Sequence, residues 1–136
     1  MIINQYLLQL FIIGMGGFVG AILRFVISAH VQQLNKGLFF PWGTLTVNLL
    51  GCLIMGILIQ LNESWQFFSP EVKNFIFVGL LGSLTTYSTF SNDALNLFIE
   101  HRYAASMIYM TTQLIFGLLA VFVGRLISQL IIFRIF

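Results

Sequence analysis

A carboxamide, a dense run of hydroxyl groups and several aromatic rings are the groups in this sequence whose types and spacing could do chemistry. Asn48 follows Thr44 by four residues, so in a helix the two side chains would share one face. Seven hydroxylated residues fall within positions 83–91, and Tyr109 and Gln113 are again four apart. An amide in an apolar environment must be hydrogen-bonded. It could join helices to one another or donate to a passing anion, and the pattern leaves both interpretations open.

These polar stripes contain no Asp, Glu, Lys or His, which limits their chemistry. A proton relay or a carboxylate ring for cations would need such groups, and we expect Asp93 and Glu100 to lie too near the end of their span to serve. Aromatic ring edges carry partial positive charge, so hydroxyls, amides and rings together suit a small anion. No Ser–His–Asp set, acid pair, metal cluster or phosphate-binding loop is visible, and the chain is not expected to be an enzyme.

Membrane-spanning helices would have to position these groups. Of the 136 residues, 59% are hydrophobic and 7% are charged, too few charges to cover a water-soluble surface. Four apolar stretches reach about the 20 residues that a span needs. They are Leu7–Ala29, Trp42–Leu61, Val72–Phe98 and Ala104–Phe133. No Lys or Arg precedes the first stretch, so we interpret it as a retained span and not as a signal peptide. The prediction is an all-α membrane protein with four spans in one transmembrane domain, residues 1–136.

The third span is predicted to be broken at its centre. Its hydroxyl-rich run favours bonds between side chains and the local backbone, which compete with the helix. Broken helix at membrane depth is tolerated only inside protein or beside a wet cavity. The alternative is an ordinary Ser/Thr-rich packed helix. In the first span, Gly14, Gly16, Gly17 and Gly20 indicate a packing face, and Arg24 either reaches the membrane interface or finds an acceptor.

The basic residues are divided evenly between the two sides of the predicted membrane. Lys73, Arg125 and Arg134 would lie on the side of the termini, and Arg24, Lys36 and Arg102 on the other. Three against three leaves the positive-inside rule without a preference. Either orientation is left to the first span, or the chain inserts both ways and assembles as an antiparallel pair. Basic residues scattered singly predict no nucleic-acid partner, and the single cysteine, Cys52, cannot form a disulfide within the chain.

Three segments carry a resemblance to a known family. They are GGFVGAILR at 16–24, GTLTVNLLG at 43–51 and GSLTTYSTFS at 82–91. With them the chain resembles the Fluc (CrcB) fluoride channels over nearly its whole length. The last two segments, in this order on successive spans, are the more specific signature. The resemblance implies a passive, fluoride-selective channel of the plasma or inner membrane. It also implies a dual-topology antiparallel homodimer with two pores, which exports fluoride that enters as HF.

The resemblance also assigns roles to individual residues. It implies a fluoride pore formed by Asn48, Tyr87, Ser88, Thr89, Phe90, Tyr109 and Gln113. Backbone carbonyls of Gly82 and Thr85 are expected to hold a structural Na⁺ at the dimer centre, and Arg24 is expected to attract anions at a vestibule. The chain departs from the family at three positions. Tyr87 replaces a phenylalanine, Asp93 replaces a glutamate, and Gln113 replaces a serine or threonine.

One alternative concerns the partner of the predicted channel, and two rival interpretations come from other functional classes. Some members of the family pair with a second homologous chain, so a heterodimer is an alternative to the homodimer. A small dual-topology secondary transporter would need a membrane-embedded carboxylate to couple protons. A non-conducting accessory protein would explain the glycines, but not the hydroxyl run aligned with an amide and aromatic rings.

Overall fold

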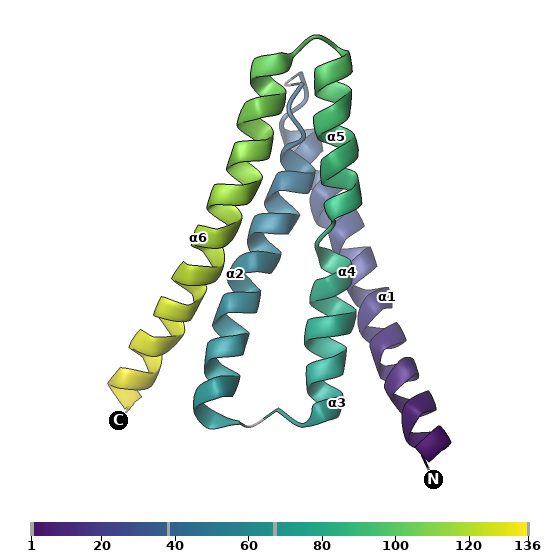
Figure 1. Cartoon of the computed structure of the whole chain (residues 1–136), viewed down its shortest axis with the longest axis vertical. Helices are drawn as coiled ribbons and strands as arrows, with labels where there is room; N and C mark the ends of the chain where they lie inside the picture. The colour runs from purple at the N-terminus through teal and green to yellow at the C-terminus, as the bar shows by residue number, and fades with distance from the viewer. Residues whose placement is uncertain (1, 38, 67, 136) are drawn as a thin grey trace.

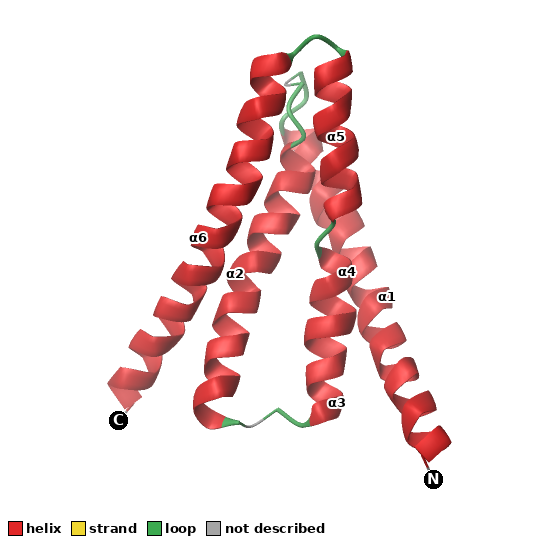
Figure 2. Cartoon of the chain, in the orientation of Figure 1, coloured by secondary structure: helices red, strands yellow, loops and turns green. Residues whose placement is uncertain are grey.

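The computed structural model describes residues 2–37, 39–66 and 68–135, and every regular element in these ranges is helical (Figure 2). The order is α1 (Ile2–Leu34), α2 (Trp42–Trp65), α3 (Pro70–Lys73), the π-helix η1 (Asn74–Leu81), α4 (Gly82–Leu84), α5 (Tyr87–Ile99) and α6 (Tyr103–Ile135). Within the described ranges, three helices are long and apolar enough to cross a membrane: Ile3–Leu34, Trp42–Trp65 and Tyr103–Arg134. The prediction of an all-helical chain with several apolar spans is confirmed.

The helices run alternately up and down the long axis of the molecule. Figure 1 shows α1 and the series α3–η1–α4–α5 rising from one end, while α2 and α6 return to it. The two termini and the α2–α3 connection therefore lie at the same end, and the helices converge toward the other (Figure 1). The predicted third span, 72–98, is divided among α3, η1, α4 and α5, so no single helix covers it.

The backbone leaves the helix at Thr85 and Thr86, between α4 and α5. Their φ/ψ angles of −85°/155° and −150°/115° are extended (Figure 2). The Thr85 hydroxyl donates to the Leu81 carbonyl at 3.0 Å, and the Thr86 hydroxyl accepts the Thr89 N–H at 3.2 Å. Thr86 thus acts as the N-cap of α5. The hydroxyl-rich run ends one helix and starts the next, because its side chains satisfy backbone groups that the helix would otherwise pair.

Glycines allow two pairs of helices to touch backbone to backbone. A Cβ added at Gly16 or Gly20 of α1 would meet the backbone of η1, at Phe75 and Leu80 respectively. Between α2 and α6, Gly56 and Gly124 face each other's helices in the same way. Close approach of this kind maximises van der Waals contact, on which helix association in lipid depends. It also holds α4 at a fixed distance from α1.

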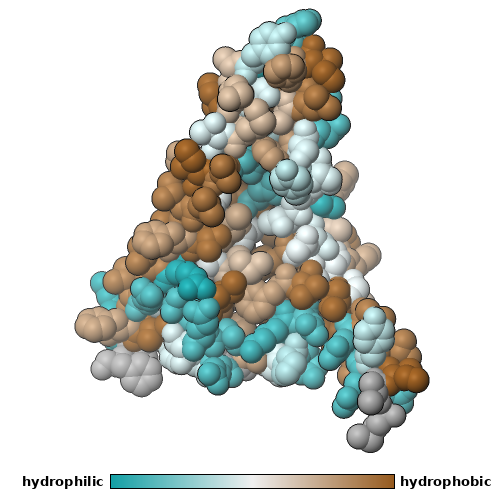
Figure 3. Space-filling model, viewed as in Figure 1, coloured by the Kyte–Doolittle hydropathy of each residue, from teal (hydrophilic) through white to brown (hydrophobic). Residues whose placement is uncertain are grey.

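The surface of the isolated chain is largely apolar. Large hydrophobic side chains on α1 and α6, among them Phe11, Phe25 and Phe116, are exposed. Figure 3 shows hydrophobic surface along α6, whereas hydrophilic groups gather near the end that carries the termini and the α2–α3 connection. Ion pairs lie at the ends of the bundle, where Arg125 bonds Glu63 at 2.9 Å and Arg102 bonds Glu100 at 3.3 Å. This distribution suits a molecule whose middle faces lipid.

We expect the same Gly→Ala substitution to have opposite effects at two positions of α1. At Gly14 an added Cβ has nothing within 4 Å, so Gly14→Ala should raise stability by up to about 1 kcal/mol through helix propensity. At Gly20 the Cβ would meet the Leu80 carbonyl, and Gly20→Ala should lower stability by about 1–3 kcal/mol. Thermal unfolding midpoints of the detergent-purified variants measure both, and shifts of the same sign would contradict this packing.

Candidate functional site

Asn48 of α2 pairs with the backbone exposed at the helix break. Its carbonyl oxygen Oδ1 accepts the Thr86 N–H at 2.8 Å, and its Nδ2 donates to the Thr86 carbonyl at 3.1 Å. A carboxamide offers a donor and an acceptor side by side, like a peptide group, so one side chain satisfies both backbone groups of Thr86. Thr86 is only 8% exposed, and leaving those groups unpaired there would be costly.

A chain of hydrogen bonds continues from Asn48 through the bundle. The second Nδ2 proton of Asn48 is donated to Oε1 of Gln113 at 3.3 Å, and Gln113 donates from Nε2 to the Tyr109 hydroxyl at 3.4 Å. Tyr109, fully buried, donates in turn to the Asp93 carboxylate at 3.3 Å. Thr44 donates to the same Asp93 oxygen at 2.7 Å. A continuous polar track therefore runs between α2, α5 and α6.

Asp93 corrects the expectation that the polar stripes contain no acid. The sequence places it near the end of the third apolar stretch, 72–98, but α5 begins at Tyr87 and directs Asp93 toward α2 and α6. The side chain is half-buried and its Oδ2 accepts two hydrogen bonds. The signal that could have located it is the i, i+4 pair of Thr44 and Asn48, because both ends of that stripe contact the α5 segment.

Three aromatic rings follow one another beside this track. Phe90 lies 5.4 Å from Tyr109 and 5.7 Å from Tyr87, measured between ring centroids, with interplanar angles of 48° and 53°. Aromatic ring edges carry partial positive charge, so a tilted series of rings presents several such edges close together. Tyr109 and Phe90 lie inside the fold, whereas Tyr87 is 80% exposed in the single chain.

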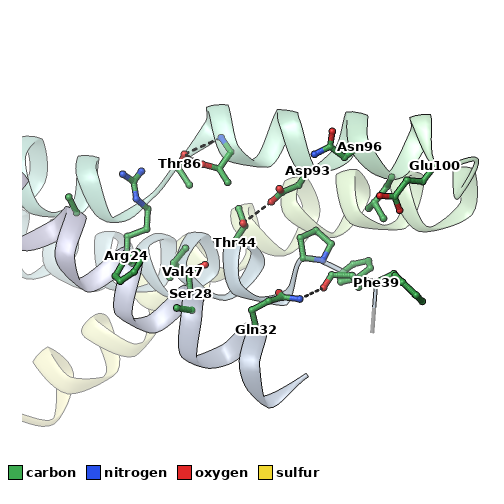
Figure 4. Close-up of a pocket in the computed structure, with 17 residues that line it drawn as sticks. Arg24, Ser28, Gln32, Phe39, Thr44, Val47, Thr86, Asp93, Asn96 and Glu100 are labelled. Atoms are coloured by element: carbon green, nitrogen blue, oxygen red, sulfur yellow. Dashed lines mark hydrogen bonds between the residues drawn. The ribbon is translucent and has the colours of Figure 1, made fainter. Parts of the chain in front are cut away.

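Two open cavities border the break. One is lined by Arg24, Ser28, Thr44, Thr86, Thr89 and Asp93 among other residues. Figure 4 shows Arg24 and Ser28 on α1, Thr44 on α2 and Asp93 on α5 around this cavity. The other is lined by residues that include Asn48, Thr86, Tyr87, Phe90 and Gln113. Thr86 lines both cavities. The sequence did not single out Thr86 as a site residue, although it contributes to the walls of both cavities.

The predicted site residues therefore divide into groups. Asn48, Tyr87, Phe90 and Gln113 share the second cavity, with Tyr109 bonded to Gln113 behind them. Arg24 and Thr89 line the first cavity. Ser88 is exposed beside them, with its hydroxyl 3.4 Å from that of Thr86. In the described part of the chain no carboxylate forms an ion pair with Arg24, although Asp93 and Glu100 line the same cavity.

The carbonyls of Gly82 and Thr85 have lost their usual helical donors. In an uninterrupted helix they would accept from the amides of Thr86 and Thr89. The structure commits the first amide to Asn48 and the second to the Thr86 hydroxyl. Gly82 is also exposed and carries no side chain to cover its carbonyl. Neutral oxygen donors of this type fit a hard cation such as Na⁺.

Comparisons with known proteins extend over all of these elements. A family profile described as "CrcB-like protein, Camphor Resistance (CrcB)" matches residues 11–125. The protein named "Fluoride-specific ion channel FluC" from Shewanella loihica is 40% identical over 127 residues, which cover 93% of this chain and 98% of that protein. Its namesake from Magnetococcus marinus is 37% identical over 124 residues, covering 91% and 100%. "Fluoride-specific ion channel FluC 1" from Methanosarcina acetivorans is 36% identical over 115 residues, covering 85% and 86%.

Replacing Asn48 with leucine should destabilise the break. Both backbone groups of Thr86 would lose their partner, at a cost of about 1–3 kcal/mol for each buried group left unpaired. Hydrogen exchange of peptides covering residues 83–90 should then become faster. Asn92→Leu is the matched control, because Asn92 lies on α5 with an exposed side chain. Equal protection of these peptides in both variants would contradict the role assigned to Asn48.

Proposed function

This chain belongs to the CrcB family, and on that premise we propose that it is a passive, fluoride-selective channel of the cell membrane and not an enzyme. It is a multi-pass membrane protein. Its activity is to release cytoplasmic fluoride and so lower the toxicity of that ion. The observation that carries the proposal is the cavity in which an amide, a helix break and aromatic ring edges meet.

The proposed membrane topology has four spans. The series α3–η1–α4–α5 supplies the third, with the extended Thr85–Thr86 link inside it. The up-and-down course of the chain in Figure 1 supports this topology, because the termini share one end. An interrupted span is acceptable in a bilayer when the freed backbone groups are satisfied, and Asn48 satisfies those of Thr86.

The exposed polar surface around the break supports assembly with a second copy. Tyr87, Ser88, Thr89 and Ser91 are all exposed in the single chain, although the apolar surface around them suits lipid. Ser88, Thr89 and Ser91 each make one hydrogen bond within the chain, but hydrocarbon offers nothing to the remaining polar capacity of this surface, so cover by protein or water is favoured. A second copy inserted in the opposite direction would bring the two breaks together, and the even division of basic residues permits both orientations. A homologous second chain is the alternative partner.

Selectivity in this proposal comes from replacing the hydration shell of the ion. Fluoride is small and strongly hydrated, so it needs several donors along its path. Asn48, Ser88 and Thr89 provide polar N–H and O–H groups, and Tyr87, Phe90 and Tyr109 provide ring edges. Several modest sites favour conduction over tight retention. Arg24 raises the anion concentration in the first cavity, an effect that salt would screen.

A structural Na⁺ held by Gly82 and Thr85 completes the proposed dimer. Both carbonyls are free of their helical donors and lie next to the exposed polar surface. When bound, the cation supplies positive charge to oxygen atoms that two copies would otherwise bring together without partners. Because these ligands are backbone carbonyls, the proposed cation site depends on the helix break and not on which side chains stand at positions 82 and 85.

Asp93 favours one alternative, a secondary transporter that exchanges fluoride for protons. A half-buried carboxylate in the polar track is the kind of group that couples proton movement. The two functions differ in their driving force. A passive channel lets fluoride follow its own gradient at any pH difference, whereas a proton-coupled carrier accumulates fluoride when only a pH gradient is imposed.

Liposomes that contain only this purified chain should release fluoride when a potassium ionophore dissipates the membrane potential that would otherwise oppose fluoride efflux. Release is measured with a fluoride electrode, and chloride release under the same conditions should be negligible. A chain that needs a homologous partner, or that is no channel, would give no fluoride release.

Phe90→Ile should abolish this release while the protein stays assembled, because isoleucine fills similar space without a polar ring edge. Phe116→Ile on α6 is the matched control and should leave release unchanged, since Phe116 is exposed on the apolar surface. Undiminished efflux through Phe90→Ile would exclude ring edges as part of the path.

Replacing Na⁺ with N-methylglucamine during purification and reconstitution should reduce fluoride release reversibly. The freed carbonyls of Gly82 and Thr85 would then lack a counter-charge at the contact between copies. Adding Na⁺ back should restore the initial rate, whereas K⁺ should restore less because of its larger radius. Full activity in protein that has never met Na⁺ would contradict the cation site.

A further inference from the structure

We propose that Gln113 sets the rate of ion entry by occupying the Asn48 N–H group that a passing anion must take. This inference rests on the proposed function and deepens it. Both protons of the Asn48 amide are engaged in the structure, one by the Thr86 carbonyl and one by Oε1 of Gln113. An ion that receives a hydrogen bond from Asn48 must therefore displace one of these acceptors.

The distances indicate which acceptor is displaced. The two bonds between Asn48 and the Thr86 backbone measure 2.8 Å and 3.1 Å and reinforce each other. The bond to Gln113 measures 3.3 Å, and Gln113 is held at its other end by a bond of 3.4 Å. Typical N–H···O bonds are about 2.9–3.0 Å long, so both contacts of Gln113 are weak. Breaking the Asn48–Gln113 bond exposes one N–H and leaves the helix break paired.

The orientation of Gln113 follows from its neighbours. Asp93 accepts the Tyr109 proton, so the Tyr109 oxygen is free to accept from Nε2 of Gln113. With its NH₂ group directed to Tyr109, Gln113 can present only its oxygen to Asn48. The side chain is thus a positioning residue held with an acceptor against the donor of Asn48. Gln113 and Asn48 both line the cavity that contains Phe90 and Tyr87.

A shorter side chain at position 113 would release this donor. The hydroxyl of serine ends two bonds earlier than the amide oxygen of glutamine, and it cannot span the same gap to Asn48. The Asn48 N–H would then face the cavity, where water pairs with it until fluoride arrives. Exchanging water is easier than exchanging an amide tethered to Tyr109, so Gln113→Ser should lower the barrier to entry.

The test measures initial fluoride efflux from proteoliposomes at low fluoride concentration. Gln113→Ser should release fluoride about twofold to tenfold faster than the unchanged chain, the factor that one neutral hydrogen bond is worth. Gln129→Ser is the matched control. It changes the same residue type on the same helix, at an exposed position beside Ile132 and away from the break, and its rate should equal that of the unchanged chain.

A double-mutant cycle separates this role from a structural one. Tyr109→Phe removes the hydroxyl that holds Nε2 of Gln113. In the chain that keeps Gln113, this substitution should speed efflux by a smaller factor than Gln113→Ser does. In the Gln113→Ser background it should leave the efflux rate unchanged. The inference would be overturned if Gln113→Ser released fluoride no faster than the unchanged chain. It would also be overturned if the factors by which the two single substitutions change the rate simply multiplied in the double variant. Absence of efflux through the unchanged chain would overturn the proposed function as well.

Discussion

The rest of the site depends on one pairing, between the Asn48 carboxamide and the backbone of Thr86. An extended segment inside a helix bundle leaves an N–H and a C=O without helical partners, and a bilayer offers no water to satisfy them. Asparagine resolves this with a single side chain because its amide mimics a peptide group. With Thr86 fixed in this way, its hydroxyl can cap α5, and the carbonyls of Gly82 and Thr85 lose the amides of Thr86 and Thr89 as donors.

The pairing in turn requires α2 to approach the break very closely. Gly51 of α2 faces the Thr85 side chain, and a Cβ at this position would overlap it. On the other side, Gly16 and Gly20 hold α1 against η1, which leads directly into α4 and the break. The glycines of this chain therefore act together. They bring three backbones near one point while leaving open space beside it for two cavities that both include Thr86.

Residue types and spacing predicted much of this fold, for identifiable reasons. The long apolar runs predicted where the helices lie along the chain. The hydroxyl-rich run indicated where the third apolar stretch departs from helical geometry. The position of Asp93 could not be predicted, since it depends on α5 restarting at Tyr87 with a new rotational register. The π-helical turns of η1 add to the same difficulty, because they alter which side chains face α1. The i, i+4 spacing places Gln113 on the same helix face as Tyr109, but nothing in the sequence indicated that Gln113 would also reach Asn48.

The location of Asp93 decides whether a carboxylate is compatible with the proposed path for anions. A carrier that couples protons needs its carboxylate to be reached in turn from both sides of the membrane. Asp93 lines the cavity of Arg24 and is not among the residues that line the cavity of Phe90 and Gln113. Its Oδ2 also accepts hydrogen bonds from both Thr44 and Tyr109, so the carboxylate is tied to α2 and α6. A carboxylate held in this way orients donors along the track, and that arrangement favours a channel over an exchanger.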